Sequence, residues 1–281
     1  MNTNRIFNLW FVRVIAFLLV AVGGMIVEYL IGNAFNLKNS GIAPLFILIG
    51  MTSIEYLRGG TIQTVGFSFD EKTHFDLIIG FMLGSLPIVV YIVILYAFQL
   101  VQISDVKDIV PSGMISIIMF AILEELLFRG MIFQACVERF SFPSMSLLFS
   151  ALFASAHVLN PSFDLLSMLN TFLAGLLFSY AWYHSRSLWL PIAIHIGWNL
   201  TLYMTGLTLS GLDTTASFII VNIHPNVWQP WLNSAYGIEG TVYCTVMLIF
   251  MGFIISNISI APQRYARFFD LEYYIHQSRH E

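Results

Sequence analysis

The sequence predicts an all-α membrane protein that crosses the bilayer about eight times. Hydrophobic residues make up 58% of the 281 residues and charged residues only 10%, whereas a soluble domain carries roughly 25% charged residues. The mean hydropathy is +0.79. Apolar stretches long enough for the hydrocarbon core, which needs about 20 residues, recur along the whole chain. We therefore expect a single multi-pass domain over residues 1–281.

The expected spans follow one another with short polar connections. The first apolar stretch is full length and is not followed by a small-residue cleavage site, so we predict a retained helix and not a signal peptide. Pro111 and Pro143 precede the fourth and fifth spans, where proline starts a helix well. Trp228 and Trp231 in the longest loop, 210–236, favour a segment at the membrane interface. We place the eight spans at about residues 10–32, 42–57, 76–100, 112–137, 143–159, 164–183, 188–209 and 237–260.

The distribution of lysine and arginine predicts the orientation. With eight spans, both termini lie on one side, and that side holds nine of the 12 basic residues. The other side holds only Lys38 and Lys107, and Arg129 falls within a span. The positive-inside rule therefore places both termini in the cytoplasm of a cell-membrane protein. Residues 261–281 would form a cytoplasmic juxtamembrane tail, either as an amphipathic surface helix or as a solvated segment.

Composition also limits the partners. A clustered basic face for nucleic acid is absent. Cys136 and Cys244 lie in separate apolar segments and form no C-x-x-C motif, so they indicate neither a disulfide framework nor a redox site. The expected partners are the lipid bilayer and a membrane-associated peptide or protein, and the sequence carries no signal for the oligomeric state.

The fourth span contains Glu124-Glu125-Leu126-Leu127-Phe128-Arg129 at its centre. On insertion scales each ionisable group at that depth costs roughly 2.5–3.5 kcal/mol, so such groups persist where they face a protein interior or a water-filled cavity. Glu125 and Arg129 are spaced i, i+4 and share a helix face. Glu124 and Glu125 diverge by about 100° around the helix. One carboxylate can therefore face a cavity while the other is paired. Glu28 and Glu55, by contrast, lie near span ends, where a carboxylate reaches the headgroups at low cost.

Two of the seven histidines, His157 and His195, fall within expected spans. Asn199 follows His195 by four residues and Phe153 precedes His157 by four, so each pair shares a helix face. Each of these residues taken singly is explained by packing, as intramembrane polar groups commonly bond to a neighbouring helix. Two carboxylates, two imidazoles and an amide on three helices together indicate a polar functional site.

This set of groups is suited to hydrolysis of an amide. A carboxylate near an imidazole can activate water as a general base, and imidazole and amide N–H groups on one face can stabilise an oxyanion. The same groups could instead hold zinc, although the helical H-E-x-x-H pattern is absent. A serine mechanism is disfavoured because Ser155 lies nearly opposite His157 and no G-x-S-x-G occurs. An aspartyl dyad is excluded because the acids of the spans are almost all glutamate. A transporter relay would be accompanied by broken helices in paired repeats, which we do not find.

Three motifs in this order resemble the CPBP family, the CAAX proteases and bacteriocin-processing enzymes that are also called the Abi family. The family pattern E-E-x-x-x-R corresponds to Glu124–Arg129, F-x-x-x-H to Phe153–His157, and H-x-x-x-N to His195–Asn199. The resemblance runs from about residue 112 to 200. Each motif alone is weak, but the three together on apolar helices are specific.

The resemblance implies an intramembrane glutamate-type endopeptidase with eight helices around a membrane-embedded cavity and a catalytic core at 112–209. It implies that Glu124 is the main catalytic carboxylate and that His157 helps to activate water. His195 and Asn199 would form the oxyanion site. Glu125 would support the catalytic chemistry, and Arg129 and Phe153 would orient it. No cofactor is implied, with zinc left open. Substrates in the family are prenylated C-terminal peptides, leader peptides or pheromone precursors. Some members are reported as immunity or interaction proteins, so a non-catalytic membrane protein on the same scaffold is the alternative.

Overall fold

A computed structural model describes residues 6–35, 41–104, 111–214, 220–224 and 228–257 of the chain. The fold is all-α, as expected, with one small pair of strands and one 3-10 turn. The helices are α2 (Trp10–Phe35), α3 (Ile42–Leu57), α4 (Glu71–Ala97), α5 (Pro111–Phe128), α6 (Met131–Arg139), α7 (Phe142–Ala156), α8 (Leu165–Ser185), α9 (Trp189–Thr205) and α10 (Val242–Asn257). The remaining elements are β1 (Val101–Ser104), β2 (Ile220–Ile223) and η1 (Ile238–Gly240). The predicted tail 261–281 lies outside the described residues.

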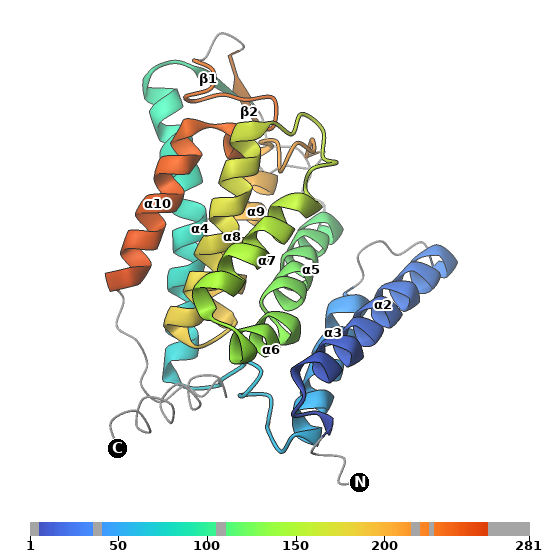
Figure 1. The fold of residues 1–281 in the computed structure, drawn as a ribbon. Coiled ribbons are helices and arrows are strands. Elements are labelled where there is room, and N and C mark those ends of the chain that lie inside the picture. Colours follow the sequence, from blue (N-terminus) through green and yellow to red (C-terminus); the bar gives the residue numbers. More distant parts are fainter. Residues whose placement is uncertain (1–5, 36–40, 105–110, 215–219, 225–227, 258–281) are drawn as a thin grey trace.

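The helices form a bundle in which successive long helices run in opposite directions, with the short α6 at its lower end (Figure 1). Within the described residues, α2, α4 and α8 are long and apolar enough to cross a membrane, and α3, α7 and α10 are shorter apolar helices. The expectation of an all-α membrane protein is therefore confirmed.

The fourth expected span is wrong as a single helix. The structure ends α5 at Phe128 and begins α6 at Met131, so Glu124 and Glu125 lie in the last turns of a helix and not at the centre of a span. Gly130 explains the break, because a Cβ at this position would lie 2.1 Å from the carbonyl oxygen of Leu126. The side chain of Gln134 donates a hydrogen bond of 3.1 Å to the Arg129 carbonyl, which the break leaves without its helical partner.

Helix α9 is the most enclosed element of the bundle and crosses α4 at very short range. A Cβ on Gly84 of α4 would lie 2.1 Å from the carbonyl oxygen of Ile194, so the two backbones meet as small residues allow between membrane helices. Ile194 packs in the apolar cluster of α4, α8 and α10. Ile192 packs in a second cluster that joins α9 to α2, α3 and α6. Helix α9 is thus held on two sides, which fixes the positions of His195 and Asn199.

Buried ion pairs attach the α2–α3 hairpin to the rest of the bundle. Arg13 of α2 lies 2.5 Å from Glu138 of α6, and Arg58 lies 3.3 Å from the same carboxylate. Glu55 pairs with Arg58 at 2.8 Å. Glu28 accepts hydrogen bonds from the first backbone N–H groups of α3, including that of Ala43 at 3.0 Å. Glu28 and Glu55 therefore have partners within the protein, and Glu55 is buried and does not reach toward the headgroups as expected.

The long loop 210–236 contains a strand that the sequence did not predict. Strands β1 and β2 pair antiparallel, with Val101 opposite Ile223. Four residues are too few for the period-2 alternation of a strand to be recognised. Trp228 and Trp231 of the same loop are exposed, and their placement at a membrane interface stays a prediction.

Candidate active site

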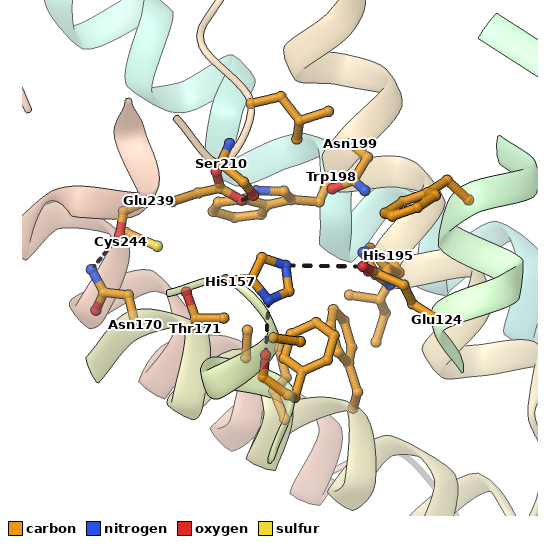
Figure 2. Close-up of a pocket in the computed structure, with 18 of the residues that line it drawn as sticks. Glu124, His157, Asn170, Thr171, His195, Trp198, Asn199, Ser210, Glu239 and Cys244 are labelled. Carbon is orange, nitrogen blue, oxygen red and sulfur yellow. Dashed lines mark hydrogen bonds and ion pairs between the residues drawn. The ribbon is translucent and has the colours of Figure 1, made fainter. Parts of the chain in front are cut away.

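A cavity of about 330 Å³ lies between α5, α7, α8, α9 and α10 and is closed by the segments around Ser210 and Glu239. Of the residues predicted from the sequence, Glu124, Phe153, His157, His195 and Asn199 line it. Figure 2 shows Glu124, His157 and His195 turned toward one another. Glu125 and Arg129 do not line the cavity and lie behind it.

Glu124 is the carboxylate that faces both imidazoles. One of its oxygens lies 3.4 Å from Nε2 of His195, and the other lies 4.0 Å from Nε2 of His157. One water molecule can bridge groups at the longer separation. The structure therefore brings together the three side chains on which the sequence-based hypothesis depends, although they come from α5, the end of α7, and α9.

The other ring nitrogen of each histidine is held by a hydrogen-bond acceptor. Nδ1 of His157 lies 2.8 Å from the carbonyl oxygen of Phe153, and Nδ1 of His195 lies 2.9 Å from Oε1 of Glu125. Because a carbonyl oxygen only accepts, His157 donates from Nδ1 and leaves Nε2 for the cavity. His157 also sits just past α7 as its C-cap residue, and not within a span as predicted. This position lets the ring turn back toward Glu124.

Glu125 and Arg129 form a fully buried pair behind His195. Their side chains approach to 3.1 Å and neither is exposed. Arg129 also donates to the carbonyl oxygen of Gly175 at 2.9 Å. Its guanidinium lies 4.7 Å from the ring centre of Phe153 and 5.1 Å from that of Phe178. The i, i+4 pairing predicted from the sequence is present, and the contacts favour a positioning role for both residues.

Each of the two imidazoles also packs against an aromatic ring. Phe178 stacks on His195 with ring centres 4.8 Å apart and planes 18° apart. Phe153 packs against His157 with ring centres 4.8 Å apart. Asn199 lies one helical turn after His195 on α9 and faces the same cavity (Figure 2). The amide of Asn199 and the imidazole of His195 thus line the same cavity.

Sequence reasoning missed one ionisable residue of the cavity, Glu239. It lies in η1, outside the expected core 112–209, and its carboxylate accepts hydrogen bonds from the backbone N–H of Ser210 and from Nε1 of Trp198. It lies at the start of the eighth expected span, 237–260, and in none of the three motifs. Its sequence neighbours Gly237 and Gly240 were the available signal for a turn.

Residues 107–201 match the model of a family described as type II CAAX prenyl endopeptidase, Rce1-like. The match covers about a third of the chain and contains all three motifs. It confirms the resemblance stated from those motifs and supports a protease kind of activity in a membrane protein. No curated protein and no solved structure matches the chain.

Proposed function

We propose that this chain is an intramembrane endopeptidase that hydrolyses a peptide bond of a membrane-associated peptide or protein. Prenylated and leader-type peptides are the candidate substrates, and the cell membrane is the expected location. The observation that carries the proposal is the approach of Glu124 to both imidazole Nε2 atoms, at 3.4 and 4.0 Å, within a cavity that is otherwise largely apolar. Such a cavity excludes bulk water and strengthens the action of charged groups inside it.

In the proposed mechanism, Glu124 and His157 activate the attacking water. The water lies between the Glu124 carboxylate and Nε2 of His157 and gives a proton to Glu124 as its oxygen attacks the scissile carbonyl. The proton is then delivered to the nitrogen of the leaving amine as the C–N bond breaks. No covalent link between enzyme and substrate forms, so one water is consumed for each bond cleaved.

His195 and Asn199 stabilise the oxyanion of the tetrahedral intermediate in this proposal. Asn199 donates from its amide, and His195 acts through Nε2, which faces the cavity because Nδ1 is bonded to Glu125. Glu125 and Arg129 hold the His195 ring in this orientation. Donors fixed before the reaction are worth typically 10²–10³ in rate each.

A zinc-dependent mechanism at this site is the alternative, and a direct test distinguishes it from the metal-free mechanism. Within the described residues no group of three or more His, Cys, Asp or Glu side chains is arranged to hold a metal ion. Nevertheless, imidazoles whose Nδ1 atoms are held by acceptors are also typical of zinc ligands. Metal analysis of purified protein decides the matter: stoichiometric zinc that is lost in the His157→Ala variant would overturn the metal-free mechanism.

Peptidomics of cells tests the proposed function. Cells that carry wild-type protein are compared with cells that carry Glu124→Ala at equal protein level, with Glu71→Ala as the control because Glu71 is an exposed acid at the start of α4. We expect an uncut precursor to accumulate only with Glu124→Ala. If both Glu124→Ala and His195→Ala support normal function, the chain is a non-catalytic immunity or interaction protein on the same scaffold.

A further inference from the structure

The cavity contains a second carboxylate, Glu239, which the proposed hydrolysis does not use. Three neutral donors hold it in place: the backbone N–H of Ser210, the Ser210 hydroxyl at 3.2 Å and Nε1 of Trp198 at 3.2 Å. In Figure 2, His157 lies between Glu239 and Glu124, and it is close enough to interact electrostatically with both. Glu239 therefore lies near the expected scissile bond, on the side of His157 away from Glu124.

Glu239 has no permanently charged cation beside it, and His157 is the basic side chain of the cavity that it interacts with. Among the described residues that line the cavity there is no lysine or arginine. Arg129 does not reach it, because this side chain is fully buried against Glu125, Gly175 and two phenylalanine rings. The cavity lining combines apolar side chains, among them Leu209, Leu212 and Leu248, with the neutral polar side chains of Asn160, Asn170 and Thr171. An ionised carboxylate that is held by neutral donors and has no lysine or arginine beside it is costly, and a cation supplied by a ligand lowers that cost.

We propose that Glu239 binds a positively charged side chain of the substrate, a lysine or arginine close to the scissile bond. This inference rests on the proposed function and adds a substrate class to it: an apolar peptide with one basic residue beside the cleavage site. The fixed carboxylate retains room for a further donor, since its oxygens together offer about four acceptor positions. Lysine and arginine supply such donors together with the missing charge.

Cleavage of a peptide library by the purified protein tests this inference. The peptides are blocked at the amino end, amidated at the carboxyl end and apolar, with a single variable position occupied by lysine, norleucine, glutamine or glutamate. Mass spectrometry of the products gives relative kcat/KM values. We expect wild type to favour lysine over norleucine by at least about tenfold, the usual size of a charge-assisted hydrogen bond. In Glu239→Gln this ratio falls toward one, because glutamine keeps an acceptor for Ser210 and Trp198 but has no charge.

Two further variants serve as controls. Ser210→Ala removes one hydrogen bond to Glu239 but not its charge, so the preference for lysine persists. Glu71→Gln removes an exposed carboxylate far from the cavity in sequence and leaves the ratio unchanged. A wild-type enzyme that cleaves lysine and norleucine peptides equally well, or a preference that survives in Glu239→Gln, overturns the inference and leaves the proposed function intact. Failure to cleave any peptide of the library contradicts both proposals.

Discussion

The buried pair of Glu125 and Arg129 is the feature on which the position of His195 depends. Glu125 contacts both Arg129 and His195 through the same oxygen, at 3.1 and 2.9 Å. Removing one member of a buried ion pair leaves an unpaired charge and costs about 3–5 kcal/mol, whereas replacing both by apolar residues costs much less. Single and double variants of Glu125 and Arg129 therefore test whether the two charges stabilise each other.

Glu125→Leu and Arg129→Met should each lower thermal stability strongly, and the double variant should lose less than the sum of the two. The physical reason is that the double variant contains neither buried charge without its partner. Thermal unfolding of the four proteins in detergent measures the coupling. Losses that simply add would show that the two side chains do not act as a pair.

Asn199→Ala should lower kcat by about 10²–10³ with little change in KM, because an oxyanion donor acts mainly in the transition state. The matched control is Asn222→Ala, which removes an exposed amide of β2 that bonds only to Ser104 among the described residues. Steady-state kinetics on a peptide identified by peptidomics measures both. An Asn199→Ala enzyme with the kcat of wild type would remove this residue from the oxyanion site.

For single residues, the i, i+4 spacing predicted which side chains share a helix face, and the contact between Glu125 and Arg129 agrees with that prediction. The spacing could not show that the Phe153 carbonyl holds His157, because that bond depends on α7 ending one residue before the histidine. Nor could it place Glu239 in the cavity, since only the folding of the segment before α10 brings this residue to Ser210.

Among the elements, the break between α5 and α6 decides where the two glutamates lie. Apart from Glu124, Glu125 and Arg129, residues 112–137 are mostly apolar and contain no proline, so periodicity alone predicts one helix. The structure ends α5 where Arg129 turns into the core, and Gln134 bonds both the Arg129 and Val65 carbonyl oxygens at 3.1 and 3.0 Å. These are tertiary contacts, so helix propensity alone cannot predict the break.

Gly130→Ala should destabilise the protein and reduce activity, since the new methyl group would meet the Leu126 carbonyl oxygen at 2.1 Å and displace the end of α5. Gly23→Ala in α2 is the matched control, because its Cβ would have 3.8 Å to the nearest side chain, that of Phe46. Thermal unfolding and cleavage rate are compared for the two variants. Equal behaviour of the two would mean that the break is not held by close packing at Gly130.

For the whole molecule, composition predicted the class of fold, whereas the even number of passes expected from the placement of arginine and lysine stays a prediction. It did not predict the ion pairs of Arg13 and Arg58 with Glu138, which join segments far apart in the chain. Which side of the membrane each loop faces stays a prediction. Two exposed residues on opposite sides of the expected topology, Lys72 and Trp228, allow it to be tested.

Lys72→Cys and Trp228→Cys, each in a background without Cys136 and Cys244, should differ in labelling by a membrane-impermeant maleimide in intact cells. The buried native cysteines are removed so that each protein carries one thiol. If both termini are cytoplasmic, the cysteine at position 228 reacts and the one at position 72 reacts only after permeabilisation. The reverse pattern would invert the assigned orientation.

The most direct test of the central claim is the rate of peptide cleavage by purified protein in liposomes, measured for wild type and Glu124→Gln. The substitution keeps the size of the side chain but removes the base that faces both imidazoles, at 3.4 and 4.0 Å. We expect the rate for Glu124→Gln to fall by about 10²–10⁴, the usual contribution of a general base. The thermal stability of this variant should equal that of wild type, and the control variant Glu71→Gln should keep full activity. A Glu124→Gln enzyme that cleaves at the wild-type rate would contradict the account.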